Sequence, residues 1–201
     1  MVVVHYTAMP SCAEAEARLC DPAAEVSAHY LIAETGRVIA LVPEAMRAWH
    51  AGAGAWGPVG DVNSRSIGIE LANTGTAPFP DPQMRALIAL LADLRGRWPI
   101  PPERVIGHSD MAPGRKQDPG PRFDWRRVAL AGQSVWPEPG GDPEAPLASS
   151  LTRIGYPEAD PQTRLAAFRL RFRPWASGPE DATDRALAAD LARRFPVDGA
   201  A

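Results

Sequence analysis

The sequence predicts an α/β fold in which helices pack on a mixed β-sheet. The chain opens on three consecutive valines, Val2–Val4, a run typical of a strand buried on both faces of a sheet. Two apolar stretches, 27–32 and 38–42, are separated by the turn residues 34–37, which indicates a β-hairpin. Residues 81–98 have the apolar stripe of an amphipathic helix that can cover one face of the sheet.

The other elements of the first 131 residues follow in order. Ser11 and Glu14 have the spacing of a capping box, which predicts a helix through Cys20. The two cysteines of this helix would lie about 12 Å apart at about 1.5 Å per residue, beyond the reach of a disulfide, so we expect two free thiols. Residues 66–71 alternate as a strand does, and residues 104–107 form a short apolar strand.

The composition changes after residue 131. Residues 132–146 are rich in Pro and Gly and predict a stiff linker. Three helical apolar patterns follow, and some fifty residues make only a marginal core of their own. We therefore expect a catalytic domain at 1–131, a linker at 132–146 and a small three-helix module at 147–201 that docks on the domain.

Charge and hydropathy exclude several function classes. The formal net charge is −3 and no basic run is present, which argues against a nucleic-acid partner. No apolar stretch approaches the roughly 18–20 residues of a membrane span. The chain opens on a strand and not on a charged and then apolar leader, so we expect no signal peptide and a cytoplasmic location. We also expect a monomer. A periplasmic location stays open if an N-terminal segment is missing from this sequence.

Two distant segments carry the side chains of an open metal site. His5 ends the first strand, and His108 and Asp118 bracket a stretch that prolines and glycines can fold back. Catalytic zinc typically takes three such N and O ligands and leaves a fourth position for water, whose pKa it lowers to about 7. Taken singly, each residue is also typical of a structural role, as a hydrogen-bonded histidine or an aspartate that caps a turn.

Five motifs follow one another over about residues 1–130: VHYT at 4–7, VSAHY at 26–30, AWHAG at 48–52, NSRSIGIEL at 63–71 and HSDMAPGRKQDPGP at 108–121. Together they resemble the zinc-dependent N-acetylmuramoyl-L-alanine amidases of the bacterial amidase-2 family. The resemblance implies an amidase-2 or peptidoglycan-recognition-like fold, Zn²⁺ as cofactor, and peptidoglycan or a muropeptide as substrate. It implies hydrolysis of the amide between N-acetylmuramic acid and the L-alanine of the stem peptide. Residues 147–201 resemble a small peptidoglycan-binding module.

The resemblance also implies catalytic roles for single residues. His5, His108 and Asp118 would hold Zn²⁺. Glu70 would be the general base, and Lys116 would face the developing oxyanion. Glu70 is the one acid in its predicted strand, and an exposed strand acid is its alternative interpretation.

A second group of residues would contact or support the substrate site. Trp49, His50, Asn63 and Arg115 would line the substrate, with Arg115 facing a stem-peptide carboxylate. His29 would lie behind the ligands. The alternatives are a buried core position for Trp49, a structural hydrogen-bonded role for either histidine, and a solvated surface position for Arg115.

Two other functions stay open at this point. Relatives of this fold bind muropeptide without catalysis after losing metal ligands, and a zinc peptidase would cut elsewhere in the stem peptide. The presence of all three ligands together with Glu70 and Lys116 favours the amidase. The sequence does not distinguish intact sacculus, muropeptide and 1,6-anhydro fragments as substrates. It also does not show whether the C-terminal module binds peptidoglycan or only supports the fold.

Overall fold

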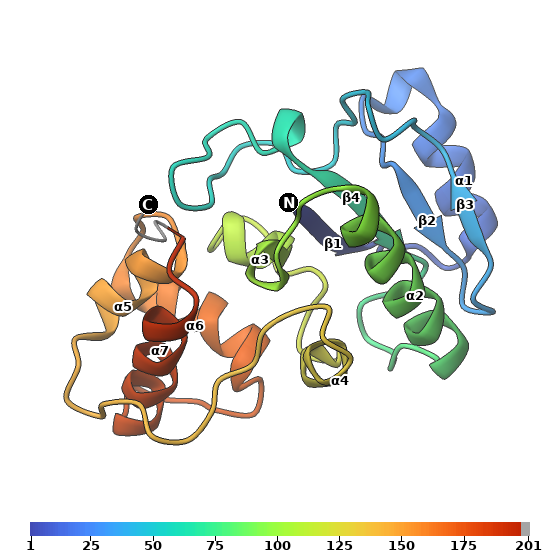
Figure 1. The fold of residues 1–201 in the computed structure, drawn as a ribbon. Helices are drawn as coiled ribbons and strands as arrows, with labels where there is room; N and C mark the ends of the chain where they lie inside the picture. The colour runs from blue at the N-terminus through green and yellow to red at the C-terminus, as the bar shows by residue number, and fades with distance from the viewer. Residues whose placement is uncertain (198–201) are drawn as a thin grey trace.

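The computed structural model describes residues 1–197, which are built around one five-stranded sheet (Figure 1). The strand order is β3-β2-β4-β1-β5, and the strands are β1 Val2–Tyr6, β2 Tyr30–Ile32, β3 Val38–Ala40, β4 Ile67–Leu71 and β5 Val105–Gly107. Four of the strands are parallel, and β3 alone runs antiparallel, against β2. The predicted mixed sheet is confirmed.

Seven α-helices surround the sheet in the described residues: α1 Cys12–Cys20, α2 Asp81–Arg97, α3 His108–Met111, α4 Trp125–Leu130, α5 Leu147–Ile154, α6 Pro161–Phe172 and α7 Ala182–Arg194. Three short 3₁₀ turns, Pro22–Ala24, Asn63–Arg65 and Pro102–Arg104, complete the list. The sequence did not predict α3 and α4, because helices of four and six residues are too short to show a helical apolar period. The stretch after β5 was expected to be a loop and instead opens with α3.

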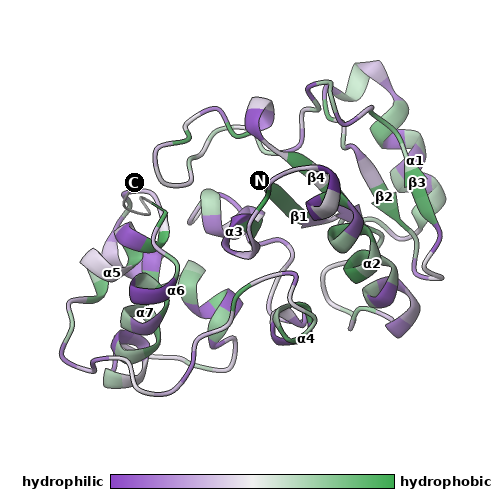
Figure 2. Ribbon diagram, in the orientation of Figure 1, coloured by the Kyte–Doolittle hydropathy of each residue, from purple (hydrophilic) through white to green (hydrophobic). Residues whose placement is uncertain are grey.

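The central strand β1 separates two apolar layers. Val2 and Val4 pack with α2 and α4 on one face, while Val3 belongs to a cluster on the opposite face. Figure 2 shows β1 and β4 in the green of hydrophobic residues. Because side chains alternate along a strand, His5 projects to the same face as Val3.

The three predicted C-terminal helices are present and share a core with the sheet. Val3 and Ile106 of the sheet lie in one buried cluster with Leu151 of α5 and Phe168 of α6. α6 also contacts α3, and Figure 1 shows the two side by side. Between α4 and α5, residues 132–146 form neither helix nor strand.

Two further expectations have clear outcomes. Cys12 is buried and Cys20 is exposed, and both are free thiols as predicted. Within residues 1–197, no helix combines the length and the apolar character that a membrane crossing requires. The last residues of the predicted module, 198–201, lie outside the described residues.

Candidate active site

The parallel strands bring three distant residues to one edge of the sheet. His5 of β1 is in register with Glu70 of β4, and His108 follows directly after β5. The backbone N–H of Ser109 donates to the carbonyl of Asp118 at 2.9 Å and so draws that residue alongside. α/β sheets bind ligands just outside the carboxyl ends of their parallel strands, which is where these residues lie.

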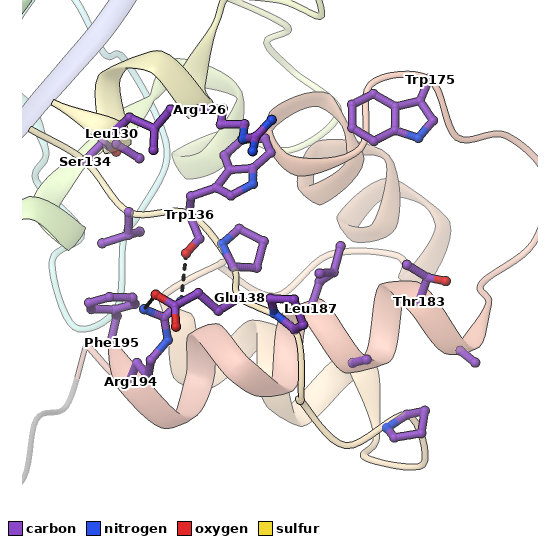
Figure 3. A pocket seen from close by; sticks show the side chains of 17 residues that line it. Arg126, Leu130, Ser134, Trp136, Glu138, Trp175, Thr183, Leu187, Arg194 and Phe195 are labelled. Carbon is purple, nitrogen blue, oxygen red and sulfur yellow. Dashed lines mark hydrogen bonds and ion pairs between the residues drawn. The ribbon is translucent and has the colours of Figure 1, made fainter. Parts of the chain in front are cut away.

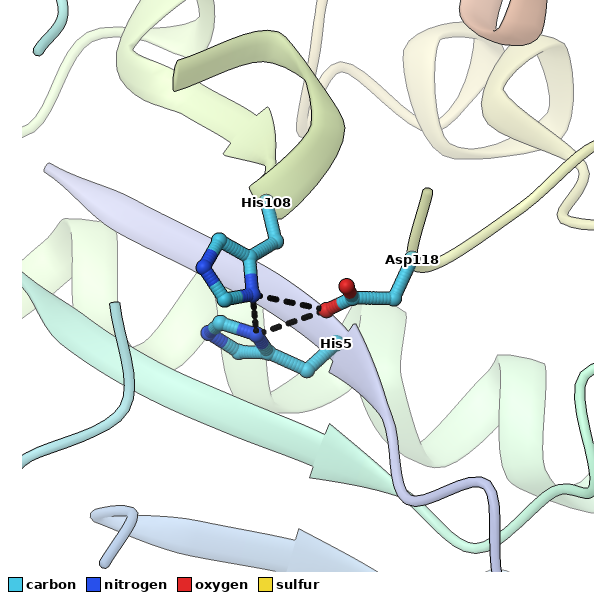
Figure 4. A group of neighbouring side chains, drawn as sticks. All are labelled: His5, His108 and Asp118. Atoms are coloured by element: carbon cyan, nitrogen blue, oxygen red, sulfur yellow. Dashed lines mark hydrogen bonds and ion pairs between the residues drawn. The ribbon is translucent and has the colours of Figure 1, made fainter. Parts of the chain in front are cut away.

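His5, His108 and Asp118 meet at a single point (Figure 4). The Nδ1 atoms of the two histidines lie 3.0 Å apart, and Asp118 Oδ2 lies 2.9 Å from His5 Nδ1 and 3.0 Å from His108 Nδ1. Burial lowers the pKa of His5 to about 4, so its imidazole is neutral at pH 7. Burial raises the pKa of Asp118, but the two adjacent histidine rings outweigh that effect and hold the pKa below its usual value.

The second ring nitrogen of His108 fixes its tautomer. Nε2 lies 2.8 Å from the carbonyl oxygen of Ala51, which can only accept, so we assign the ring hydrogen to Nε2. A guanidinium nitrogen of Arg115 approaches the same atom at the longer distance of 3.3 Å. With its hydrogen on Nε2, His108 presents the lone pair of Nδ1 to the cluster.

A chain of hydrogen bonds fixes the tautomer of His5 in the same way. The Ser66 hydroxyl donates to the carbonyl of Val62 and therefore accepts from His50 Nε2, which lies 3.2 Å away. His50 Nδ1 then accepts from His5 Nε2 at 3.0 Å. His5, too, is left with a lone pair on Nδ1.

These assignments place two lone pairs and one carboxylate oxygen against one another. Acceptors this close repel unless a cation lies between them, and metal-ligating histidines commonly donate their other N–H to a protein acceptor. His5, His108 and Asp118 offer ligand atoms that all lie within 4.8 Å of one another. The donor set and its hydrogen-bonded surroundings fit a bound metal ion.

Glu70 lies beside this cluster with an unsatisfied carboxylate. Within residues 1–197 its Oε2 is buried and has no hydrogen-bond partner. Burial raises the pKa of Glu70 to about 8, with a further contribution from the negative charge of Asp118 and an opposing one from Lys116. A carboxyl group with a pKa near neutrality and a free oxygen is suited to proton transfer.

A cleft of about 460 Å³ opens over the cluster. Its floor is formed by the three clustered residues and Glu70, and Lys116 lies on its wall. Further lining residues come from the end of β1, the loop that follows it, α1 and the segments before β2 and β4; they are Tyr6, Thr7, Ala8, Met9, Ala15, Arg18, Leu19, Val26, Ser27, Trp49 and His50. Lys116 and Asp118 both line the cleft, and the backbone N–H of Lys116 donates to the carbonyl of Ala112 within a turn.

A larger cavity of about 980 Å³ lies between α4, α7 and the segment that joins α4 to α5 (Figure 3). Trp136, Leu187 and Phe195 supply much of its lining. Among its charged lining residues, Arg194 donates to Glu138 and to the carbonyl of Trp136. None of the predicted site residues lines this cavity, so the chemistry belongs to the smaller cleft.

Gly68 leaves the space that His50 fills. A Cβ atom at Gly68 would lie 2.3–2.6 Å from three atoms of the His50 ring, which is below any tolerable contact. We expect Gly68→Ala to cost about 1–3 kcal/mol of stability and to displace His50 from His5. Thermal unfolding and metal titration would measure both effects. Gly60→Ala is the matched control, because a Cβ there meets nothing within 4 Å; equal behaviour of the two variants would contradict this role of Gly68.

Residues 1–121 match the family model described as N-acetylmuramoyl-L-alanine amidase. The chain is also 36% identical over 234 residues to N-acetylmuramoyl-L-alanine amidase AmiD of Escherichia coli K12, an alignment that covers 98% of this chain and 84% of AmiD. This chain belongs to the N-acetylmuramoyl-L-alanine amidase family. The predicted family and the predicted class of enzyme, an amidase, are confirmed.

Other relatives of this amidase differ in how much of the chain they share. The 1,6-anhydro-N-acetylmuramyl-L-alanine amidase AmpD of Enterobacter cloacae is 47% identical over 102 residues, which is 51% of this chain and 54% of AmpD. AmiD from E. coli in complex with anhydro-N-acetylmuramic acid-L-Ala-D-γ-Glu-L-Lys has a TM-score of 0.87 at 37% identity, covering 98% of this chain and 90% of that one. AmpDh3 from Pseudomonas aeruginosa in complex with anhydromuramic pentapeptide has a TM-score of 0.88 at 31% identity, covering 98% and 92%. The predicted fold class is thereby confirmed.

Two of the predicted substrate residues of the amidase line the cleft. Trp49 stands at its rim with 54% of its surface exposed, which excludes a core position. His50 also lines it, but both ring nitrogens have protein partners. His50 therefore supports His5 and has no free polar atom to offer a substrate.

Asn63 and Arg115, which were predicted to line the substrate, are not among the residues that line the cleft. Asn63 Oδ1 accepts from the backbone N–H groups of His50 and Ala51, at 3.1 and 2.8 Å. The guanidinium of Arg115 donates to the carbonyls of Ala51 and Ala53. The backbone polar groups of residues 50–53 have no partners in the sheet, so these two side chains hold that segment in place. The segment in turn orients His50 and His108.

His29 lies directly behind His50, in keeping with a supporting position. Its ring centroid is 5.7 Å from that of His50. One ring nitrogen accepts from the backbone N–H of Gly68 at 2.9 Å, and the other lies 3.0 Å from the carbonyl of Met46. The ring is fully buried, so it does not reach the cleft.

Sequence reasoning missed Ser66, Asp110 and Arg171. Ser66 and Asp110 lie inside motifs that resemble the family, but no spacing rule marks them as partners of other residues. Arg171 lies 61 residues after Asp110, its ion-pair partner, and no local pattern announces that contact.

Proposed function

We propose that this amidase uses zinc to hydrolyse the amide between N-acetylmuramic acid and L-alanine in muropeptides. The observation that carries the proposal is the cluster of His5, His108 and Asp118. Two lone pairs and a carboxylate converge there and require a cation, at the floor of a cleft that also holds the unsatisfied Glu70.

Zinc is the metal that this donor set favours. Two imidazole nitrogens and one carboxylate oxygen are typical of catalytic zinc sites with one open position. Bonds of about 2.0–2.1 Å in a tetrahedral arrangement place ligand atoms about 3.3 Å apart, close to the separations in this cluster. When bound, zinc supplies positive charge that polarises a carbonyl and lowers the pKa of water to about 7.

Glu70 and Lys116 would then carry the proton transfer and the charge stabilisation. The free Oε2 of Glu70 would take a proton from the attacking water and return it to the amide nitrogen of the leaving L-alanine. Lys116, which lines the same cleft, would face the carbonyl oxygen on which negative charge develops. The exposed indole of Trp49 at the rim offers an apolar face for a sugar ring or a peptide.

The relatives indicate which substrate to use first. The AmiD and AmpDh3 structures contain anhydromuramic peptides, and AmpD is named a 1,6-anhydro-N-acetylmuramyl-L-alanine amidase. We propose 1,6-anhydromuropeptides as substrates of this chain as well, in cell-wall turnover or recycling.

Metal analysis and product mass spectrometry test the proposed function. The zinc-loaded protein is incubated with anhydro-N-acetylmuramic acid-L-Ala-D-γ-Glu-L-Lys. We expect one zinc per chain and two products, the intact tripeptide and free anhydro-N-acetylmuramic acid. Fragments cut within the peptide would show a peptidase, and binding without products would show a recognition protein.

Lys116→Ala should lower kcat by about 10²–10³-fold and leave KM nearly unchanged, because a contact with the oxyanion forms mainly in the transition state. Steady-state kinetics on the anhydromuropeptide measure both constants. Arg122→Ala, which removes an exposed charge from the same stretch, should retain full activity. A rise in KM alone in the Lys116 variant would show that the ammonium binds ground-state substrate instead.

A further inference from the structure

A buried polar network joins the C-terminal helices to the metal-ligand segment. Arg171 of α6 donates to Asp110 Oδ2 at 2.7 Å, and the hydroxyl of Tyr156, just after α5, donates to Asp110 Oδ1 at 2.7 Å. Arg171 also donates to Ser134 Oγ at 2.9 Å and to the carbonyl of Val105 at 3.0 Å. Asp110 is fully buried and Arg171 nearly so.

Asp110 holds the backbone at the position of a metal ligand. Its Oδ2 accepts from the N–H of Gly107 at 2.8 Å, across the residue His108 that opens α3. A helix of four residues has too few hydrogen bonds to form without such support. The carboxylate of Asp110 therefore fixes the backbone between the end of β5 and the start of α3. It thereby fixes the position of the His108 imidazole.

Asp110 needs its partners from the C-terminal helices. A buried carboxylate is tolerated only when it is paired and hydrogen-bonded, and the N–H of Gly107 alone does not balance the charge. Arg171 supplies the opposite charge and stacks its guanidinium 4.3 Å from the centroid of the Trp125 ring. Tyr156 satisfies the second oxygen.

We propose that Arg171 and Tyr156 are positioning residues for the metal ligand His108, acting through Asp110. The C-terminal helices are then part of the catalytic unit and set its metal affinity. This role goes beyond that of a separate module that only binds peptidoglycan. Because zinc is the proposed metal, these roles rest on the proposed function.

The same helix offers a matched control. Arg169 of α6 is also buried in an ion pair, 2.5 Å from Asp184. Its remaining bonds go to the carbonyls of Gly178 and Pro179, so the whole pair lies within the C-terminal helices. Loss of Arg169 takes a buried guanidinium from a buried carboxylate, as loss of Arg171 does, without touching Asp110; Asp184 keeps Arg173 as its second partner.

Zinc affinity of the full chain tests the roles of Arg171 and Tyr156. Metal-free wild type, Arg171→Met, Tyr156→Phe and Arg169→Met are titrated with zinc against a competing chelator, with the folded fraction measured by circular dichroism. We expect zinc affinity to fall about 10-fold or more in Arg171→Met and several-fold in Tyr156→Phe, as for partners that orient a metal ligand. Arg169→Met should stay within about twofold of wild type per folded molecule.

Tyr156→Phe keeps the buried ring, so it still tests the positioning role if Arg171→Met does not fold. Wild-type zinc affinity in Tyr156→Phe, or an equal loss in Arg169→Met, would overturn the positioning role while leaving the proposed function intact. A wild type that binds no zinc would overturn the proposed function and the positioning role together.

Discussion

Asp118→Ala is expected to remove the metal and the activity together. Asp118 supplies the only anionic atom of the three that meet in the cluster, and its Oδ2 lies within 3.0 Å of both histidine nitrogens. Without it, two neutral nitrogens remain to hold a divalent ion in a site that excludes most water. We expect zinc content after dialysis to fall well below one per chain and kcat/KM to fall by more than about 10³-fold.

The control for this variant is a second aspartate of the same stretch. Asp124 caps α4 through a bond to the backbone N–H of Arg127 and lies outside the cleft, so Asp124→Ala should cost about 1 kcal/mol of stability and no zinc. Elemental analysis and kinetics of both proteins separate a ligand from a structural residue. Full zinc occupancy in Asp118→Ala would contradict the assignment of Asp118 as a metal ligand.

The sequence predicted the sheet and the residues at its edge because both leave local patterns. Three valines in a row indicate a strand buried on both faces, and β1 is indeed central. Glu70 also stood out locally, because it is the single acid in the alternating pattern of the strand predicted at 66–71. Parallel pairing then places Glu70 beside His5 without any further information.

The predicted substrate residues that lie away from the cleft are those whose partners are distant backbone groups. Asn63 and Arg115 are polar and lie in motifs that resemble the family, so a substrate contact was the natural interpretation. Both instead satisfy backbone groups at 50–53. The pairing of Asp110 with Arg171 is invisible for the same reason, since only the packing of α6 against α3 brings the two residues together.

Glu70→Gln should keep zinc and lose turnover. Glutamine has the same shape but cannot accept the proton of the attacking water, and Glu70 contributes no atom to the ligand cluster. We expect one zinc per chain and a fall in kcat of about 10²–10⁴-fold, measured on the anhydromuropeptide. Loss of zinc from this variant would make Glu70 a ligand and remove it from the role of base.

The stability of the metal-free protein gives a second, independent test of Glu70. Burial raises its pKa from 4.5 in the unfolded chain to about 8 in the folded one. The folded protein therefore binds one more proton than the unfolded chain between these values, and its stability falls as pH rises from about 4.5 to 8, by up to about 1.4 kcal/mol for each unit of pKa shift. Glu70→Gln has no such proton, so its advantage over wild type should be absent near pH 4 and largest above pH 8. Denaturant unfolding of both metal-free proteins across this range measures the difference, and parallel stability curves would show that Glu70 is not held as a buried, unpaired carboxyl group.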